Sequence, residues 1–283
     1  MQPKVELNKV RDVDEIISDS FLFFKQNWKP LIRSYFAICG LFLVAGLASS
    51  LLNQIIPDPD TDLTGGVFTR YYLLGAIFSF IGQVLIQILT LSYIVIYKEK
   101  GNQPAELNEV WGYVKFYIFK ILSSSVLCAI MVGIGFVLCI IPGIYLFPIC
   151  SFMIAIMVLE NTTFGYAFDR AFVLIRNNWW RVFGSLLLLA IVISIISMAV
   201  VIPALAIAGL YSMISSVNFL TIYKIPLTIA THLIQVVYVI PAIGLALCYY
   251  STNEQKEGTS LLARIEAFGN RDGAENGLTS EEY

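Results

Sequence analysis

Charged residues are scarce in this sequence, making up 13% of its 283 residues, whereas 58% are hydrophobic. A soluble domain of this length would carry about 25% charged residues, so a soluble globular protein is not expected. The net charge of −2 gives no reason to expect a nucleic-acid partner. A cleavable signal peptide is not expected either, because the N-terminal region is rich in charged and polar side chains.

Reactive and metal-binding motifs are also missing. The sequence contains one histidine and no Walker loop, HExxH, GxSxG or dinucleotide fingerprint. Its five cysteines lie in apolar segments without metal-ligand spacing, which favours packing residues over disulfides or metal ligands; they are Cys39, Cys128, Cys139, Cys150 and Cys248. We therefore expect no enzyme activity, no cofactor and no metal site.

The main feature present is a set of six long apolar segments. A helix needs about 20 apolar residues to cross the hydrocarbon layer, and the segments fall at 31–56, 71–97, 118–141, 143–159, 182–209 and 225–250. They predict an all-α polytopic membrane protein with six transmembrane helices. Pro142 and Gly143 favour a hairpin turn between the third and fourth segments. Because the fourth segment is short and contains Pro148, a re-entrant pair over 118–159 is the alternative.

Basic residues are distributed unevenly between the segments. One set of connecting regions and termini holds sixteen of the eighteen lysines and arginines, and the other set holds only Arg70 and Lys224. Basic residues concentrate on the cytoplasmic side of a membrane. This bias predicts that both termini are cytoplasmic, which agrees with an even number of spans.

A pattern of apolar and aromatic residues occurs before the first span and again before the fifth. The five positions of each copy lie on one helix face, and every position is displaced by 151 residues: Val13, Ile17, Phe21, Phe24 and Trp28, then Phe164, Phe168, Phe172, Ile175 and Trp179. A weaker third copy comprises Leu107, Trp111, Val114 and Ile118. We predict a membrane domain, 1–250, made of three repeats of an interfacial amphipathic helix plus a helical hairpin: 11–98, 104–159 and 162–250.

All four tryptophans lie in or beside these predicted interfacial helices: Trp28, Trp111, Trp179 and Trp180. Tryptophan favours the membrane interface, because its ring is apolar and its N–H needs a partner. The helices are expected to anchor the bundle in the inner leaflet. The alternative is a cytoplasmic collar that docks a partner or senses lipid.

Polar residues inside the predicted spans form a candidate intramembrane cluster, comprising Gln83, Gln87, Thr228, Thr231, His232 and Gln235. Polar side chains at membrane depth often hold helices together, although an ionisable residue there is also a functional candidate. Structural hydrogen bonding is favoured over a proton or solute site, because no Asp or Glu lies at the middle of any span.

Two further sets of residues are candidates for fixing or docking helices. Glu160 ends the fourth span, and it is either a favourable interfacial charge or the ion-pair partner of Arg170 or Arg176. The tail, 251–283, contains a predicted short helix over 259–268. One face of this helix is apolar and is expected to dock on the protein's own surface or on a partner; it comprises Leu261, Leu262, Ile265 and Phe268.

A family resemblance is visible in one part of the sequence. It covers the stretch from Ile141-Pro142-Gly143 through Glu160, followed by Arg170-Ala171-Phe172 and Arg176-Asn177-Asn178-Trp179. It resembles bacterial membrane proteins grouped with the membrane domain of glycerophosphoryl diester phosphodiesterase. The resemblance implies a six-span fold and envelope or lipid-related work. The 33 residues after 250 are too few for a catalytic barrel of about 250 residues, so we do not expect phosphodiesterase activity.

Together these features predict a non-catalytic integral protein of the bacterial inner membrane. It would act as a scaffold or accessory subunit, using its interfacial helices and tail to hold a cytoplasmic or membrane protein partner. The alternative is a transporter or lipid-handling protein with a cavity between repeats. The two hypotheses differ on whether the residues around His232 line a cavity with Gln83 and Gln87 or pack tightly against neighbouring helices.

Overall fold

The computed structural model describes residues 4–56, 70–214 and 224–258, and all regular secondary structure in these ranges is helical. Its elements are α1 (Val13–Ile55), α3 (Arg70–Glu99), α4 (Leu107–Leu138), α5 (Ile140–Leu159), α6 (Phe164–Ile175), α7 (Trp179–Ile214), α9 (Lys224–Leu233), the 3₁₀ turn η1 (Ile234–Tyr238) and α10 (Val239–Glu257). Six helical segments are long and apolar enough to cross a membrane. The prediction of a multi-pass helical membrane protein is confirmed at this level.

Helix α1 begins with a capping box. The Glu15 carboxylate accepts a hydrogen bond of 3.3 Å from the backbone N–H of Asp12, the N-cap residue. Such a pair satisfies backbone donors that the first helical turn leaves free. Helix α4 begins in the same way, because Glu109 accepts from the N–H of Glu106 at 2.8 Å.

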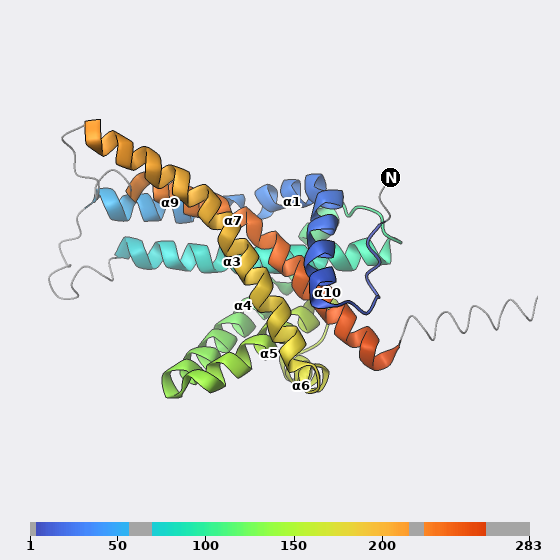
Figure 1. Cartoon of the computed structure of the whole chain (residues 1–283). Helices are drawn as coiled ribbons and strands as arrows, with labels where there is room; N and C mark the ends of the chain where they lie inside the picture. The colour runs from blue at the N-terminus through green and yellow to red at the C-terminus, as the bar shows by residue number, and fades with distance from the viewer. Residues whose placement is uncertain (1–3, 57–69, 215–223, 259–283) are drawn as a thin grey trace, which may run out of the picture.

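The boundary between the predicted interfacial helices and the spans differs from expectation. Residues 13–28 and 107–118 are the first parts of the continuous helices α1 and α4, whereas α6 alone is a separate short helix. Helix α4 contains no proline that would end it. Helix α1 changes direction along its length (Figure 1) and contains Pro30, which removes a backbone donor and bends a helix without ending it.

The turn between α4 and α5 also differs from expectation. The chain breaks at Cys139, whose extended backbone has φ −168° and ψ 141°, and Pro142 and Gly143 belong to the first turn of α5. Proline is tolerated there because the first helical N–H groups have no intrahelical partner. Gly143 instead permits close packing of the hairpin, since a Cβ at this position would overlap with the ring of Phe136.

Helices α1 and α3 form the most extensive helix pair, and α10 packs against α1, α3, α5, α6 and α7. Figure 1 shows the membrane part of α1 running beside α3, the α4–α5 hairpin projecting to one side, and α7 crossing the bundle obliquely. Helix α10 is largely enclosed by its neighbours, whereas α7 is mostly exposed. The first described residues and the end of α10 lie at the same end of the bundle, as an even number of spans requires.

Candidate functional site: a polar groove between the helices

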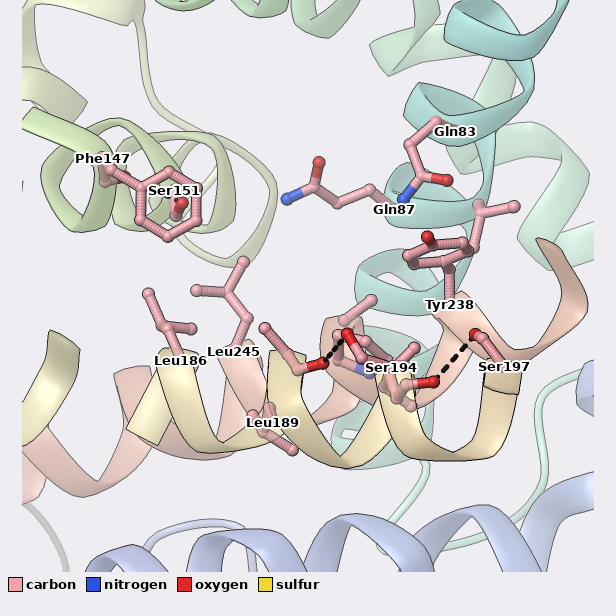
Figure 2. A pocket seen from close by; sticks show the side chains of 15 residues that line it. Gln83, Gln87, Phe147, Ser151, Leu186, Leu189, Ser194, Ser197, Tyr238 and Leu245 are labelled. Atoms are coloured by element: carbon pink, nitrogen blue, oxygen red, sulfur yellow. Dashed lines mark hydrogen bonds between the residues drawn. The ribbon is translucent and has the colours of Figure 1, made fainter. Parts of the chain in front are cut away.

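A cavity of about 510 Å³ lies between α3, α5, α7 and the η1–α10 segment. We call it the glutamine groove, because Gln83 and Gln87 of α3 project into it beside Tyr238 (Figure 2). Its other polar lining residues are Ser151, Ser194 and Ser197, and its remaining lining is apolar: Ile86, Phe147, Leu186, Leu189, Ala190, Ile193, Pro241, Ala242 and Leu245. None of these described lining residues is charged.

The groove is open at its edge, because the side chains of Gln83, Phe147 and Ser194 are exposed. The groove residues of α3, α5, α7 and α10 all lie within helices apolar enough to cross a membrane. In a bilayer such an opening faces the surrounding helices or lipid rather than bulk water. The geometry therefore combines an apolar environment with hydrogen-bonding groups on several helices.

Hydrogen bonding in the groove is incomplete. Ser194 and Ser197 donate 2.8 Å bonds to the carbonyls of Ala190 and Ile193 (Figure 2). The amides of Gln83 and Gln87, by contrast, make no side-chain hydrogen bond with any residue that the structure describes. A polar group without a partner in an apolar medium is costly, at roughly 2–7 kcal/mol. These two amides are therefore suited to bind water or the polar group of a ligand.

The other members of the predicted polar cluster lie elsewhere. His232 is 7% exposed, and its Nδ1 donates to the Thr228 carbonyl at 2.9 Å, since a carbonyl can only accept. Its Nε2 lies 3.4 Å from the Ser50 hydroxyl of α1. Gln54 of α1 donates to the Thr228 hydroxyl, and Thr231 donates to the Thr228 carbonyl at 2.9 Å. The contacts of Ser50 and Gln54 join α9 to α1.

The structure thus does not bring the six polar candidates together. Gln83 and Gln87 line the groove, whereas Thr228, Thr231 and His232 do not. Gln235 lies half-buried on η1 and does not line the groove either. Tyr238, the last residue of η1, does line the groove, and its side chain is 38% exposed.

The structure places Glu160 and Arg170 together at the end of the bundle. Arg170 Nε lies 3.3 Å from the Glu160 carboxylate, and the same guanidinium donates to Asn253 at 3.0 Å and to Glu257. Burial alone would lower the pKa of Arg170, but its bonds to Glu257 and Glu160 raise the pKa above the ordinary value. We call this set, with Tyr249, the Arg170 network. Arg176 is exposed and is not part of it.

The N-terminal segment is tied to the same end of the bundle. Arg11 is only 1% exposed; its Nε lies 2.8 Å from Asp19, and its backbone N–H donates to Ser251 of α10 at 2.9 Å. The sequence identifies Arg11 only as one of many basic residues, because nothing in its neighbourhood predicts that it is buried.

The four predicted anchor tryptophans are exposed to different degrees. Trp28 is 50% exposed, Trp111 41% and Trp180 79%, whereas Trp179 is half-buried and stacks on Tyr145 at 5.8 Å. The ammonium groups of Lys29 and Lys115 lie over the rings of Trp28 and Trp111. The predicted docking face of the tail, Leu261, Leu262, Ile265 and Phe268, lies outside the described residues.

Sequence reasoning missed the groove residues contributed by α5, α7 and η1. Ser194 and Ser197 are three residues apart in a very apolar helix, and this spacing could have indicated a polar site on one face of α7. Among the described residues, no three His, Cys, Asp or Glu side chains come together as a metal site would require. Searches against protein-family models, curated proteins and solved structures found no match. The family resemblance therefore stays a prediction.

Proposed function

We propose that this chain is a non-catalytic membrane protein that binds a lipid-like molecule in the glutamine groove. The observation that carries this proposal is the pair of amides, Gln83 and Gln87, that have no partner among the described residues and face a cavity of about 510 Å³. Ligand cavities commonly have volumes of ~300–1,000 Å³, with a mostly apolar lining and a few polar groups. Of the functions predicted from the sequence, lipid handling is the one that this geometry supports best.

The chemistry of the lining favours an uncharged polar group on the ligand. Glutamine, serine and tyrosine offer donors and acceptors but no charge, and none of the described lining residues is Asp, Glu, Lys or Arg. A charged headgroup placed there would lack an opposite charge in a poorly solvating medium. Hydroxyl, ester or amide groups attached to an apolar chain fit the groove better.

The setting we infer is the inner membrane of a bacterium, with both ends of the chain in the cytoplasm. Its support is the placement of sixteen of the eighteen basic residues on one set of connecting regions and termini. We also propose that the fold derives from three repeats and that α6 is an interfacial amphipathic helix. The displacement of matching positions by 151 residues supports the repeats. The amphipathic character of α6 is supported by its two faces: Ala167, Ala171 and Leu174 are buried, whereas Tyr166 and Asp169 are exposed.

Co-purification of lipid tests the groove. We would purify full-length protein from its native membrane, extract the bound molecules and quantify them by mass spectrometry. A Gln83→Leu/Gln87→Leu variant is expected to lose an uncharged lipid that the wild type retains. Gln235→Leu is the matched control, because it removes the same amide from a position outside the groove. Equal retention by the double variant and the wild type would refute the proposal.

A scaffold or accessory role is a second proposal. Its support is the firm attachment of the end of α10, where Lys256 donates to the Val173 carbonyl and Glu257 pairs with Arg170. The last described turn of α10, up to Glu257, is therefore fixed on the bundle. A protein partner that binds the tail would be held at this position.

A further inference from the structure

A second pocket, of about 640 Å³, lies where the α6–α7 connection meets the beginning of α5. Its lining is Ile141, Ile144 and Tyr145 of α5 together with the continuous stretch 176–181. It shares no lining residue with the glutamine groove. Unlike the groove, it contains charged side chains, so the two cavities are suited to different ligands.

The charge in this pocket comes from two arginines in different environments. Arg181 donates to Gln255 at 3.0 Å and lies 3.3 Å from Asp12, which offsets part of its charge. Arg176 is exposed and makes no ion pair or side-chain hydrogen bond with any residue that the structure describes. Two guanidinium groups beside one carboxylate leave the pocket with an excess positive charge.

The other wall of the pocket is apolar and aromatic. The Trp179 ring stacks on Tyr145 with an interplanar angle of 14°, and its Nε1 donates to the Tyr145 carbonyl at 3.3 Å. Trp180 and Ile141 are strongly exposed beside them. Exposed tryptophan, isoleucine and arginine side chains occur together where lipid headgroups meet the acyl region of a membrane.

We propose that this pocket binds an anionic phospholipid. The Arg176 guanidinium would contact the phosphate, because its planar fork matches the geometry of phosphate oxygens, and the acyl chains would cover Ile141 and Ile144. Free phosphate would satisfy only the arginine and would leave the apolar wall bare. A lipid with both parts matches the whole pocket. This site is independent of the proposed groove function.

The test is a titration of phosphatidylglycerol onto the full-length protein, followed by native mass spectrometry. Arg176→Gln is expected to weaken binding about tenfold, the loss typical of one charge-assisted hydrogen-bonding group. Arg181→Gln should weaken it less, because Asp12 already offsets part of that charge. Arg33→Gln is the matched control, since Arg33 is an exposed arginine on α1 outside this pocket.

Three further measurements distinguish binding of a whole anionic lipid from binding of phosphate alone or of any lipid. Ile141→Asn is expected to weaken phosphatidylglycerol binding without changing the charge, and diacylglycerol, which has no phosphate, should bind the wild type and Arg176→Gln equally. The proposal is overturned if Arg176→Gln or Ile141→Asn binds like the wild type. It is also overturned if Arg33→Gln weakens binding as much as Arg176→Gln, or if equimolar inorganic phosphate displaces the lipid. None of these side chains is buried, so the variants are expected to fold.

Discussion

The Tyr249 hydroxyl of α10 donates a 2.6 Å hydrogen bond to the Glu160 carboxylate, which ends α5. Arg170 of α6 lies 3.3 Å from the same carboxylate, so one side chain joins three helices. Both members of the ion pair are about one-fifth exposed. This partial burial makes the contact stronger than an exposed surface pair, which contributes ~0–1 kcal/mol.

Glu160→Gln is expected to destabilise the folded protein by about 1–3 kcal/mol, because it removes the charge that both partners face. Thermal unfolding in detergent measures the effect. Asp169→Asn is the matched control, since Asp169 is exposed and adjacent to Arg170. If the two variants melt at the same temperature, the Arg170 network does not stabilise the bundle.

Gly244 of α10 lies against Ser20 of α1 and Leu189 of α7. A Cβ at this position would overlap with Leu189 and lie 3.1 Å from the Ser20 hydroxyl. Gly244→Leu is therefore expected to destabilise the bundle by about 1–3 kcal/mol through overpacking, measured by the same unfolding assay. Gly184→Leu is the control, because a Cβ there meets no atom within 4 Å. Equal stability of the two variants would contradict the packing of α10.

His232→Ala is expected to lower stability by about 1 kcal/mol, because it removes the hydrogen bond between His232 and Ser50 of α1 and the one to the Thr228 carbonyl within α9. It should leave lipid retention in the groove unchanged, since His232 does not line the groove. Unfolding and lipid mass spectrometry on the same preparation check both parts. Loss of the lipid in this variant would instead indicate that His232 and the groove form one functional site.

Cys139 tests the membrane topology. It is the only exposed cysteine among the five and connects α4 to α5. With both termini in the cytoplasm, and with α4 and α5 each crossing the whole bilayer, an impermeant maleimide added outside the inner membrane is expected to label Cys139, and Cys139→Ser should abolish labelling. Labelling only from the cytoplasmic side would reverse the orientation or favour a re-entrant α4–α5 pair.

Truncation after Gly258 tests the scaffold proposal. Ending the chain there keeps Gln255, Lys256 and Glu257, which contact other parts of the bundle. Pull-down from native membranes with the full-length protein is expected to retain a stoichiometric protein partner that the truncated chain loses. If both proteins retain the same set of partners, the tail is not the docking element.

The sequence by itself determined the class of protein and the start of several helices. Backbone groups in a bilayer must be satisfied within the segment, so a long apolar run can only be a helix, and six such runs were visible. The capping box of Asp12 and Glu15 was also visible, because it depends on residues three positions apart. Gln83 and Gln87 were recognised as polar candidates, because they are only four positions apart in one predicted span.

Only the tertiary structure decided which helices surround which cavity. In a membrane both the lipid-facing and the helix-facing surfaces are apolar, so α7, which is apolar on most of its surface, carries no apolar stripe that predicts its neighbours. Side-chain fit between distant segments decided the central position of α10. It also separated His232 from Gln83 and placed Ser194 in the same groove as Gln87. Such fit depends on three-dimensional contacts that local spacing in a sequence does not encode.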